Sequence, residues 1–487
     1  MSPKNGTAKV IALVPRNLFS LDPRIEVPRY DREQLGAGIV HIGVGGFHRA
    51  HQAEYLDDLC NDGLRDWSIT GAGVLAADSQ MARVLHIQRG LYTLTTRSQS
   101  ELRIRVIGTI VDYLHAASDL ESLIDLVSVP TTRIVSLTIT ESGYPVDPVT
   151  GDAVDASSSP TFVVLARALE RRRAGGLPPF TVVSCDNILH NGDVTRTATL
   201  GAARELVGQA ADWIEREVPF PNSMVDRITP VTDERDREML RSEYGVLDLW
   251  PVVAEPFRQW VIEDRFVQGR PPWEEVGALV TGDVGPYESL KLRVLNAGHS
   301  TLAYLAALAG FELVDKVLAD PVFALFLRRF FDLEAGPVLP SVPGIDVEAY
   351  MTEVIERFSN PATGDQVSRL CLDGSSKFPT FLLPTIEAQL ERAGNIDLSA
   401  LALAGWCQYL LGRDDLGRVL EIADDPRKDL AIEFARASRG DPTAFLGFSE
   451  VFGRLGSQER FRASFTKALS SLRTKGSRAT LSAWLFD

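Results

Sequence analysis

Cysteine is scarce in this chain of 487 residues, and no two cysteines form a C-x-x-C pair. The four lie far apart, at Cys60, Cys185, Cys371 and Cys407. This spacing predicts reduced thiols in a cytoplasmic protein instead of a disulfide or zinc framework. Histidine is also scarce, and only His41, His48 and His51 lie close together. Because a zinc ion needs several clustered ligands, we expect no metal site.

Long apolar runs are missing as well. The longest, residues 302–309 and slightly beyond, is far shorter than the roughly 18 residues that cross a bilayer. No apolar core follows the first residues, so we expect no secretory signal. Positive charge is in deficit, and the formal net charge is −15. Nucleic acid and anionic membrane are therefore not expected partners, whereas a small ligand senses only its local pocket.

The residues that are present predict a large globular protein of two domains. In the first half, strand-like runs alternate with helical ones, which predicts an α/β domain with a mainly parallel sheet over residues 1–286. Residues 1–35 lack periodicity and are expected to form an extended surface arm. From residue 287 to 487 strand signals nearly vanish, and a mostly α-helical domain is expected. Among the individual elements, we predict a strand at 104–110 and helices at 193–218, 289–309 and 380–393.

A short apolar run at residues 38–43 predicts a buried strand, and a glycine-rich turn and a helix follow it. Strand, glycine turn and helix form the layout of a dinucleotide-binding unit, in which backbone approaches a pyrophosphate. The alternative is a bare turn between strand and helix. His48 occupies the third glycine position, which predicts looser packing of helix on strand. The cofactor-binding candidates at this turn are Gly43, Val44, Gly45, Gly46, Phe47 and His48.

A second strand is expected at residues 67–74. In dinucleotide-binding domains an acidic residue at the tip of this strand binds the adenosine ribose. No acid stands there, and Asp78, four residues on, is the nearest candidate. The sequence therefore predicts NAD as cofactor without excluding NADP.

The stretch 287–300 is rich in helix formers and contains no proline. With about 100° per residue, a helix places three polar side chains within roughly 140° of Lys291, namely Glu288, Asn296 and His299. An amine, a carboxylate, an amide and an imidazole would then share one side. Spacing alone fits a solvated helix face and a reactive site equally well.

Six segments in order give this sequence a resemblance to a known family. They are residues 43–52 (GVGGFHRAHQ), 184–192 (SCDNILHNG), 221–229 (PNSMVDRIT), 255–264 (EPFRQWVIED), 286–300 (PYESLKLRVLNAGHS) and 373–379 (DGSSKFP). The chain resembles the polyol-specific long-chain dehydrogenases, the mannitol dehydrogenase family, from about residue 36 to near its C-terminus. Residues 342–346, 356–361 and 373–379 are most similar to the mannitol 2-dehydrogenase branch.

The resemblance implies a zinc-independent, NAD-linked oxidation of a polyol secondary alcohol to a ketose, with D-mannitol and D-fructose as the expected pair. It also implies a Rossmann-type N-terminal domain, a helical C-terminal domain, an active site in the cleft between them and a monomeric protein. By this resemblance, Lys291 is the general base, because an uncharged amine can accept the hydroxyl proton. Asn187 and Asn296 would hold the alkoxide as an oxyanion hole does. His299 would orient the substrate, and Glu288 would exchange the lysine's proton with solvent.

Three further residues match family positions that contact the polyol's other hydroxyls: Asp226, Arg369 and Lys377. For each of them a structural or surface salt bridge is the alternative. Glu288 has a similar alternative, an i,i+3 ion pair with Lys291. Fructuronate reductase shares the same core motif, and D-arabinitol dehydrogenase acts on a polyol of neighbouring chain length with the same reacting diol, so both remain open as rival activities. A nicotinamide-binding protein without catalysis is disfavoured by the intact set of Lys291, Asn296 and His299.

Overall fold

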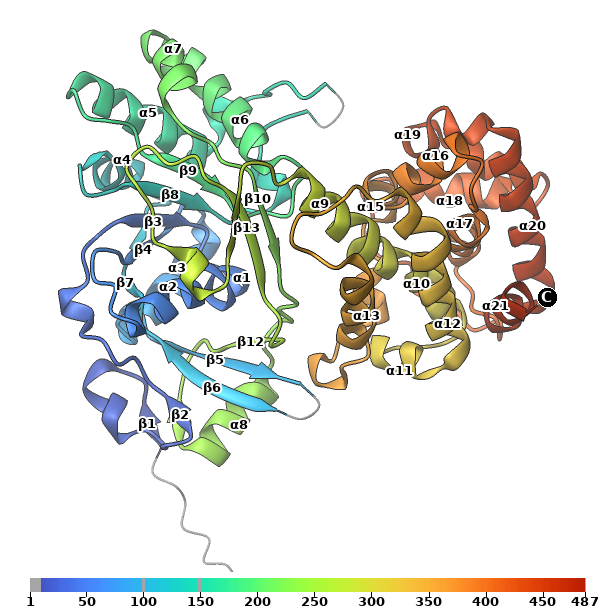
Figure 1. Ribbon diagram of the computed structural model, residues 1–487, viewed down its shortest axis with the longest axis horizontal. Helices are drawn as coiled ribbons and strands as arrows, with labels where there is room; N and C mark the ends of the chain where they lie inside the picture. The colour runs from blue at the N-terminus through green and yellow to red at the C-terminus, as the bar shows by residue number, and fades with distance from the viewer. Residues whose placement is uncertain (1–9, 99–100, 148–149, 487) are drawn as a thin grey trace, which may run out of the picture. The chain divides into compact units, whose positions relative to one another are not determined.

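The computed structural model describes residues 10–98, 101–147 and 150–486 (Figure 1). The chain forms two compact units that divide between Gly285 and Pro286. The first unit is α/β and the second is almost entirely helical, which confirms the predicted fold class. None of the helices in the described ranges combines the length and apolar character needed to cross a bilayer.

A five-stranded parallel sheet organises the first unit, with the strand order β7-β4-β3-β8-β9. Its strands are β3 (Ile39–Ile42), β4 (Ile69–Gly73), β7 (Ile110–His115), β8 (Ile134–Leu137) and β9 (Thr181–Ser184). Numbered along the chain, these strands follow the order 3-2-1-4-5 of a doubly wound fold. In such a sheet the carboxyl ends of all strands meet at one edge, where ligand-binding loops gather.

Helices cover both faces of this sheet. The helices α4 (Leu120–Ser128), α5 (Pro160–Ala174) and α6 (Asn191–Leu206) bury apolar side chains with β3 and β8 on one face. Figure 1 shows α4, α5 and α6 together beside β8 and β9. On the other face, α2 (Gln52–Asn61) packs Tyr55 and Leu56 into a second core. Burial on both faces explains the short, mainly apolar runs of β3 and β8, whereas the edge strand β7 is only partly buried and carries Asp112 and His115.

Two predicted elements of this unit are wrong in extent. The strand expected at 104–110 is two strands, β6 (Leu102–Ile107) and β7, which belong to different sheets. The helix expected at 193–218 is also two, because Val207 leaves the helical region at φ −143° between α6 and α7 (Gly208–Glu217). Neither break carries a proline, but Gly208 follows Val207 directly and begins α7.

Smaller sheets surround the central one. The order β12-β5-β6-β2 makes a four-stranded sheet, and β10-β13-β14 makes a three-stranded one. Their strands are β2 (Ile25–Glu26), β5 (Tyr92–Arg97), β6, β10 (Ser223–Asp226), β12 (Val252–Ala254), β13 (Gln259–Glu263) and β14 (Leu279–Thr281). Residues 10–35 are more than the surface arm that was predicted: β2 pairs with β6, and Leu13, Leu21 and Ile25 are buried. The first nine residues of that predicted arm lie outside the described ranges.

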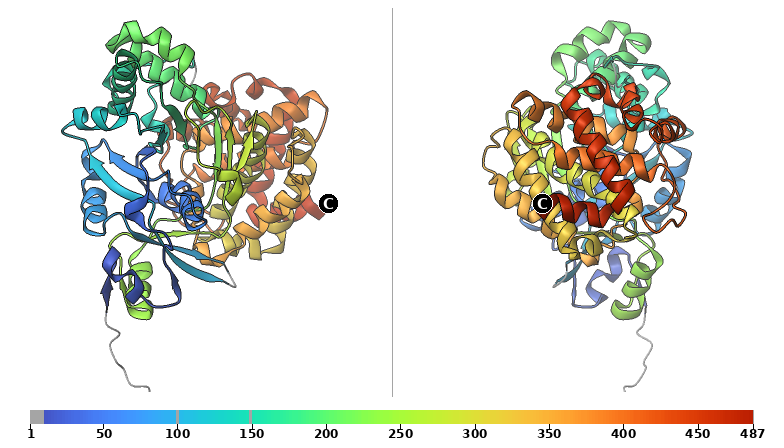
Figure 2. Two further views of the ribbon diagram at one scale, coloured as in Figure 1. Left: turned by 60° about the vertical axis from the view of Figure 1, so that its left-hand side comes forward. Right: turned by 90° about the vertical axis from the view of Figure 1, so that its right-hand side faces the viewer.

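Helices make up the second unit, and Figure 2 gives two further views of them. The longest are α10 (Ala297–Leu308), α12 (Pro321–Phe330), α13 (Val347–Phe358), α17 (Asp397–Tyr409), α18 (Lys428–Ala437), α20 (Glu459–Lys475) and α21 (Ser477–Phe486). The helix predicted at 289–309 is confirmed: α9 (Gly285–Lys291), a π-helical segment (Leu292–Asn296) and α10 follow one another without a break, and only the π-helical segment was not predicted. The helix predicted at 380–393, in contrast, is two helices, α15 (Gly374–Phe381) and α16 (Leu383–Glu391).

Candidate active site

The glycine turn follows directly from β3. Gly43 has φ +93°, and a Cβ there would lie 2.2 Å from the Thr138 carbonyl oxygen. Thr138 Oγ1 donates to the Gly43 carbonyl at 2.6 Å, which fixes the turn against the loop after β8. A Cβ on Gly45 would meet only the Gly43 carbonyl, at 3.8 Å. The turn therefore needs glycine at Gly43 for backbone reasons, and at Gly45 it leaves space for a ligand to approach the backbone.

His48 does not face outward from this turn. It is buried in α1 (Gly46–Ala50), and its ring stacks on His41 with the centroids 3.4 Å apart. His41 is itself held by the Ser136 and Thr138 hydroxyls, each at 2.8 Å. Burial first, and then the nearby charges of His41 and Arg49, keep the pKa of His48 well below its usual value. His48 is thus a neutral packing residue beneath the turn.

Asp78 lies close to the end of β4. Its carboxylate accepts a hydrogen bond from the Leu75 backbone N–H at 2.9 Å. A Cβ on Gly73 would come within 2.5 Å of the Asp78 Cβ, so the two residues are in close contact. The chain thus returns an acidic side chain to the tip of β4 from a position five residues beyond its last residue, Gly73.

Asn187 is exposed just after β9, at the same edge of the sheet as the glycine turn. Its neighbour Asp186 is buried and accepts hydrogen bonds from the Ile139 and Thr140 N–H groups, both at 2.9 Å. Asn191 donates to the Asp186 carbonyl at 3.0 Å and to the Ser223 carbonyl at 2.8 Å. Sequence reasoning missed Asp186 and Asn191, which hold the Asn187 loop in place.

Asp226 is buried at the end of β10, opposite Gln259 of β13. The next residue, Arg227, forms an ion pair with the buried Glu54 of α2, and Arg258 Nη1 lies 3.1 Å from the same carboxylate. Arg105 adds a third cation, 3.4 Å from Glu54. Burial alone would raise the pKa of Glu54, but the three arginines outweigh it and lower that pKa. Two of the six family-like segments, residues 221–229 and 255–264, therefore contribute arginines to a buried ion cluster, which is a structural role.

In the second unit, Glu288, Lys291, Asn296 and His299 all lie on the helix that contains the π-helical segment. Glu288 and Lys291 are buried, and Asn296 and His299 are partly exposed. The i→i+5 hydrogen bonds of a π-helix turn the chain less per residue than an α-helix does. Lys291 and Asn296, five residues apart, therefore come closer to one side than the 100° spacing predicts. Such π-helical turns occur frequently at functional sites.

The His299 ring is enclosed by residues that the sequence did not reveal. It stacks on Phe358 at the end of α13 with the centroids 3.8 Å apart, and its Nε2 lies 3.9 Å from Asp365. Arg369 donates two hydrogen bonds, of 2.7 and 2.6 Å, to the carboxylate of the same Asp365. Arg369 therefore forms a salt bridge, which was the alternative interpretation for this residue. Its partner Asp365 is the carboxylate that lies beside His299. The preceding residue, Gly298, packs closely on Phe331, since a Cβ there would lie 3.0 Å from that ring.

Burial lowers the pKa of His299 to about 3; the nearby Asp365 charge acts to raise this pKa, and the charges of Arg369, Arg357 and Lys377 lower it further. Lys377 of α15 is therefore near enough for its charge to act on the ring. The imidazole is neutral near pH 7, so it can both donate and accept a hydrogen bond. Neutral imidazole suits a residue that orients a hydroxyl group.

This low pKa predicts acid sensitivity. The unfolded imidazole binds a proton below about pH 6.5, whereas the folded one stays neutral, so stability is full above pH 6.5 and falls as the pH drops toward 3. Between pH 7 and pH 5, His299 should account for a loss of about 2 kcal/mol. Between pH 7 and pH 5, the free energy of unfolding of a His299→Asn variant should therefore fall by about 2 kcal/mol less than that of the wild type, as measured by denaturant titration. The exposed His86, replaced by Asn, is the control, and equal pH slopes for both variants would contradict the prediction.

In the described ranges, no group of three or more His, Cys, Asp or Glu side chains is arranged to hold a metal ion. The three histidines that lie close together in the sequence make different contacts in the structure. His41 and His48 stack on each other, whereas His51 stacks on Phe47 and its Nε2–H donates to the Gln259 carbonyl at 2.8 Å.

Comparisons with known proteins match both units. Residues 37–275 match the family described as mannitol dehydrogenase Rossmann domain, and residues 283–473 match the mannitol dehydrogenase C-terminal domain. Mannitol 2-dehydrogenase of Phaeosphaeria nodorum is 41% identical over 99% of this chain and 87% of its own length. A solved structure of Pseudomonas fluorescens mannitol 2-dehydrogenase with NAD and D-mannitol is 42% identical, has a TM-score of 0.88 and covers 98% of this chain and 99% of its own. A D-sorbitol dehydrogenase structure is 35% identical with a TM-score of 0.89, covering 97% of this chain and 100% of its own.

Proposed function

The chain belongs to the mannitol dehydrogenase family, and we propose that it is an NAD-dependent polyol dehydrogenase that oxidises D-mannitol to D-fructose. The observation that carries this proposal is the helix around the π-helical segment, which presents an amine, an amide and a neutral imidazole. Relatives named mannitol 2-dehydrogenase support the substrate, and the related structure that binds NAD and D-mannitol supports the pair of ligands.

Lys291 is the proposed general base. Alcohol oxidation needs a group that accepts the hydroxyl proton and donors that stabilise the developing alkoxide. Asn187 and Asn296 supply amide N–H donors for that oxygen, and His299 orients the hydroxyl. Glu288, one helical turn before the lysine, passes its proton to solvent. In the reverse reduction Lys291 returns the proton to the ketose oxygen.

Asp226 and Lys377 are proposed to contact the remaining hydroxyls of the polyol. Arg369 is proposed to contact these hydroxyls as well. It also has a positioning role, because its two hydrogen bonds to Asp365 fix the carboxylate beside His299. A planar guanidinium held at two points keeps Asp365 in one orientation.

The glycine turn fits a dinucleotide, because the open side of Gly45 gives its phosphates access to the backbone. When bound, NAD supplies the hydride acceptor. Gly43, Gly45 and Gly46 would contact the pyrophosphate, with Val44 and Phe47 beside it, while His48 supports the turn from below.

Asp78 is proposed to bind the adenosine ribose and to select NAD over NADP, because a carboxylate repels a 2′-phosphate. An Asp78→Asn change keeps the acceptor for the Leu75 N–H and removes the charge. We expect the ratio of kcat/KM for NADP to that for NAD to rise about tenfold or more. The exposed Asp62, replaced by Asn, is the control. An unchanged ratio in the Asp78 variant would remove Asp78 from the ribose site.

The proposed activity is tested by a spectrophotometric screen of mannitol, fructose, arabinitol and fructuronate with NAD(H) and NADP(H). The expected result is the highest kcat/KM for mannitol with NAD and for fructose with NADH. Preference for fructuronate would replace the proposal with a uronate reductase, and activity with none of the four would overturn it. A chelator added to the mannitol assay should leave the rate unchanged, since the proposed base is an amine. We further propose that the protein is a cytoplasmic monomer, and sedimentation of the same preparation tests its oligomeric state.

A further inference from the structure

A hollow of about 460 Å³ lies within the second unit, between α12, the start of α17, α20 and α21. The side chains lining it that could bind a ligand are cationic, polar or aromatic: Arg329, Lys467, Lys475, Ser470, Asn395 and Trp484. Its volume is in the range of sites that bind small molecules. None of the proposed catalytic or polyol-binding residues lines it.

Three cations line this hollow, and none of them pairs with an acidic side chain that the structure describes. Arg329, Lys467 and Lys475 form no ion pair among the described residues. The neighbouring Arg328 shows the contrast, because it pairs with Asp332 at 2.9 Å and also with Glu348. In a chain with a net charge of −15, three unpaired cations around one hollow are a local reversal of charge.

One acid, Asp397, also lines the hollow, and its charge is partly engaged. Asp397 Oδ1 accepts a hydrogen bond from the Ser464 hydroxyl at 2.5 Å. The N-terminus of α17 offers no free donors nearby, because Glu334 already accepts from the Leu398 N–H at 2.7 Å and the Ser399 N–H at 2.9 Å. An anion in this hollow would therefore be held by side chains.

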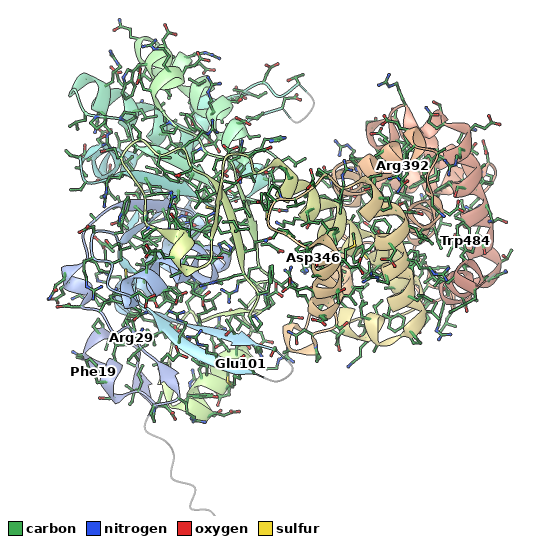
Figure 3. All side chains as sticks on the ribbon, viewed as in Figure 1. Phe19, Arg29, Glu101, Asp346, Arg392 and Trp484 are labelled. Carbon is green, nitrogen blue, oxygen red and sulfur yellow. The ribbon has the colours of Figure 1, made fainter. Side chains whose placement is uncertain are left out.

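Trp484 adds a flat apolar wall. The residue is partly exposed on α21 (Figure 3), and Lys467 Nζ lies 4.9 Å from the centre of its ring. Indole faces pack against the apolar C–H side of sugars as well as against cations. The Ser470 hydroxyl and the Asn395 amide supply groups that can bind hydroxyls.

From this combination we propose that the hollow binds the phosphate monoester of a small polyhydroxylated molecule, such as a sugar phosphate. A phosphate monoester carries between about 1.5 and 2 negative charges near pH 7, which suits a cluster of cations better than a carboxylate does. Lys467, Lys475 and Arg329 hold the phosphate, and Trp484 packs against the carbon skeleton. The ligand differs from the uncharged polyol of the proposed reaction, and the site is separate from the catalytic helix.

Isothermal titration of the full-length protein with fructose 6-phosphate tests this proposal without cofactor or turnover. The expected result is one binding event per chain that weakens with added salt. Fructose and inorganic phosphate are the comparison ligands, and each should bind about tenfold or more weakly than fructose 6-phosphate. Equal binding of inorganic phosphate would overturn the role of the sugar part. No binding of fructose 6-phosphate at about 10 mM would overturn the site itself.

Variants distinguish this hollow from the active site. The double change Lys467→Gln with Lys475→Gln should weaken fructose 6-phosphate by about tenfold or more. Lys316→Gln, which alters an exposed lysine of the same unit, should have no effect. Trp484→Phe should abolish any quenching of tryptophan fluorescence that the ligand causes while keeping an aromatic wall. Binding that survives the double change would place the ligand elsewhere, whatever the outcome of the dehydrogenase assays.

Discussion

Replacing Lys291 with alanine is expected to lower kcat by about three orders of magnitude, because the hydroxyl proton then has no positioned acceptor. Lys291 ends α9 with only 7% of its surface exposed, so bulk water is poorly placed to substitute for it. The loss should appear in kcat with mannitol and equally in single-turnover hydride transfer. NADH binding, followed by fluorescence, should change little, because the glycine turn is in the other unit.

Two controls make the Lys291 result specific. Lys316→Ala removes an exposed lysine of the same unit and should retain normal turnover. Added methylamine should restore part of the activity of Lys291→Ala, since a small amine can occupy the space that the side chain leaves. Near-normal turnover of Lys291→Ala without added amine would end the assignment of this residue as the base.

Replacing Arg227 with alanine is expected to lower the free energy of unfolding by about 3–5 kcal/mol. Glu54 is 4% exposed, and Arg227 lies against it with its side chain 1% exposed. Without Arg227, the Glu54 carboxylate keeps only Arg258 and Arg105 as partners. It then either stays charged in the core with less compensating positive charge or takes up a proton, and both outcomes lower the free energy of unfolding. Denaturant unfolding of wild type and variant measures the difference.

A matched pair of variants tests whether charge is the cause. Arg237→Ala breaks an exposed i,i+3 pair with Glu234 and should cost about 0.5 kcal/mol or less. Combining Arg227→Met with Glu54→Gln removes the uncompensated charge and should be less destabilising than Arg227→Ala alone. If the double variant is as unstable as the sum of its single changes, packing and not charge dominates at this site.

The central sheet could be predicted because burial on both faces leaves a plain trace in the sequence. Runs such as residues 38–43 and 180–185 are continuous, apolar and short, and they coincide with β3 and β9. The amphipathic helix α13 was predictable for a similar reason, as its apolar residues repeat with helical spacing. The family resemblance then identified the helix around Lys291 as the place to look for chemistry.

What escaped prediction depends on pairing in space. Arg227 and Glu54 are 173 positions apart, and isolated charges in a sequence suggest solvent exposure. Asp365, beside His299, belongs to a loop with no periodic signal. The π-helical segment has the composition of any good helix, so nothing local distinguishes its i→i+5 bonds from i→i+4 bonds.

That segment sets where the side chains that follow it lie relative to Lys291. If Leu292–Asn296 relaxed to an ordinary α-helix with the same number of residues, Asn296 and His299 would both change their angular position relative to Lys291. Every reactive side chain would still be present, and the helix would gain regularity. The identity of its residues therefore does not suffice to define this helix as a reactive site; the hydrogen-bond pattern of the backbone between them matters as much.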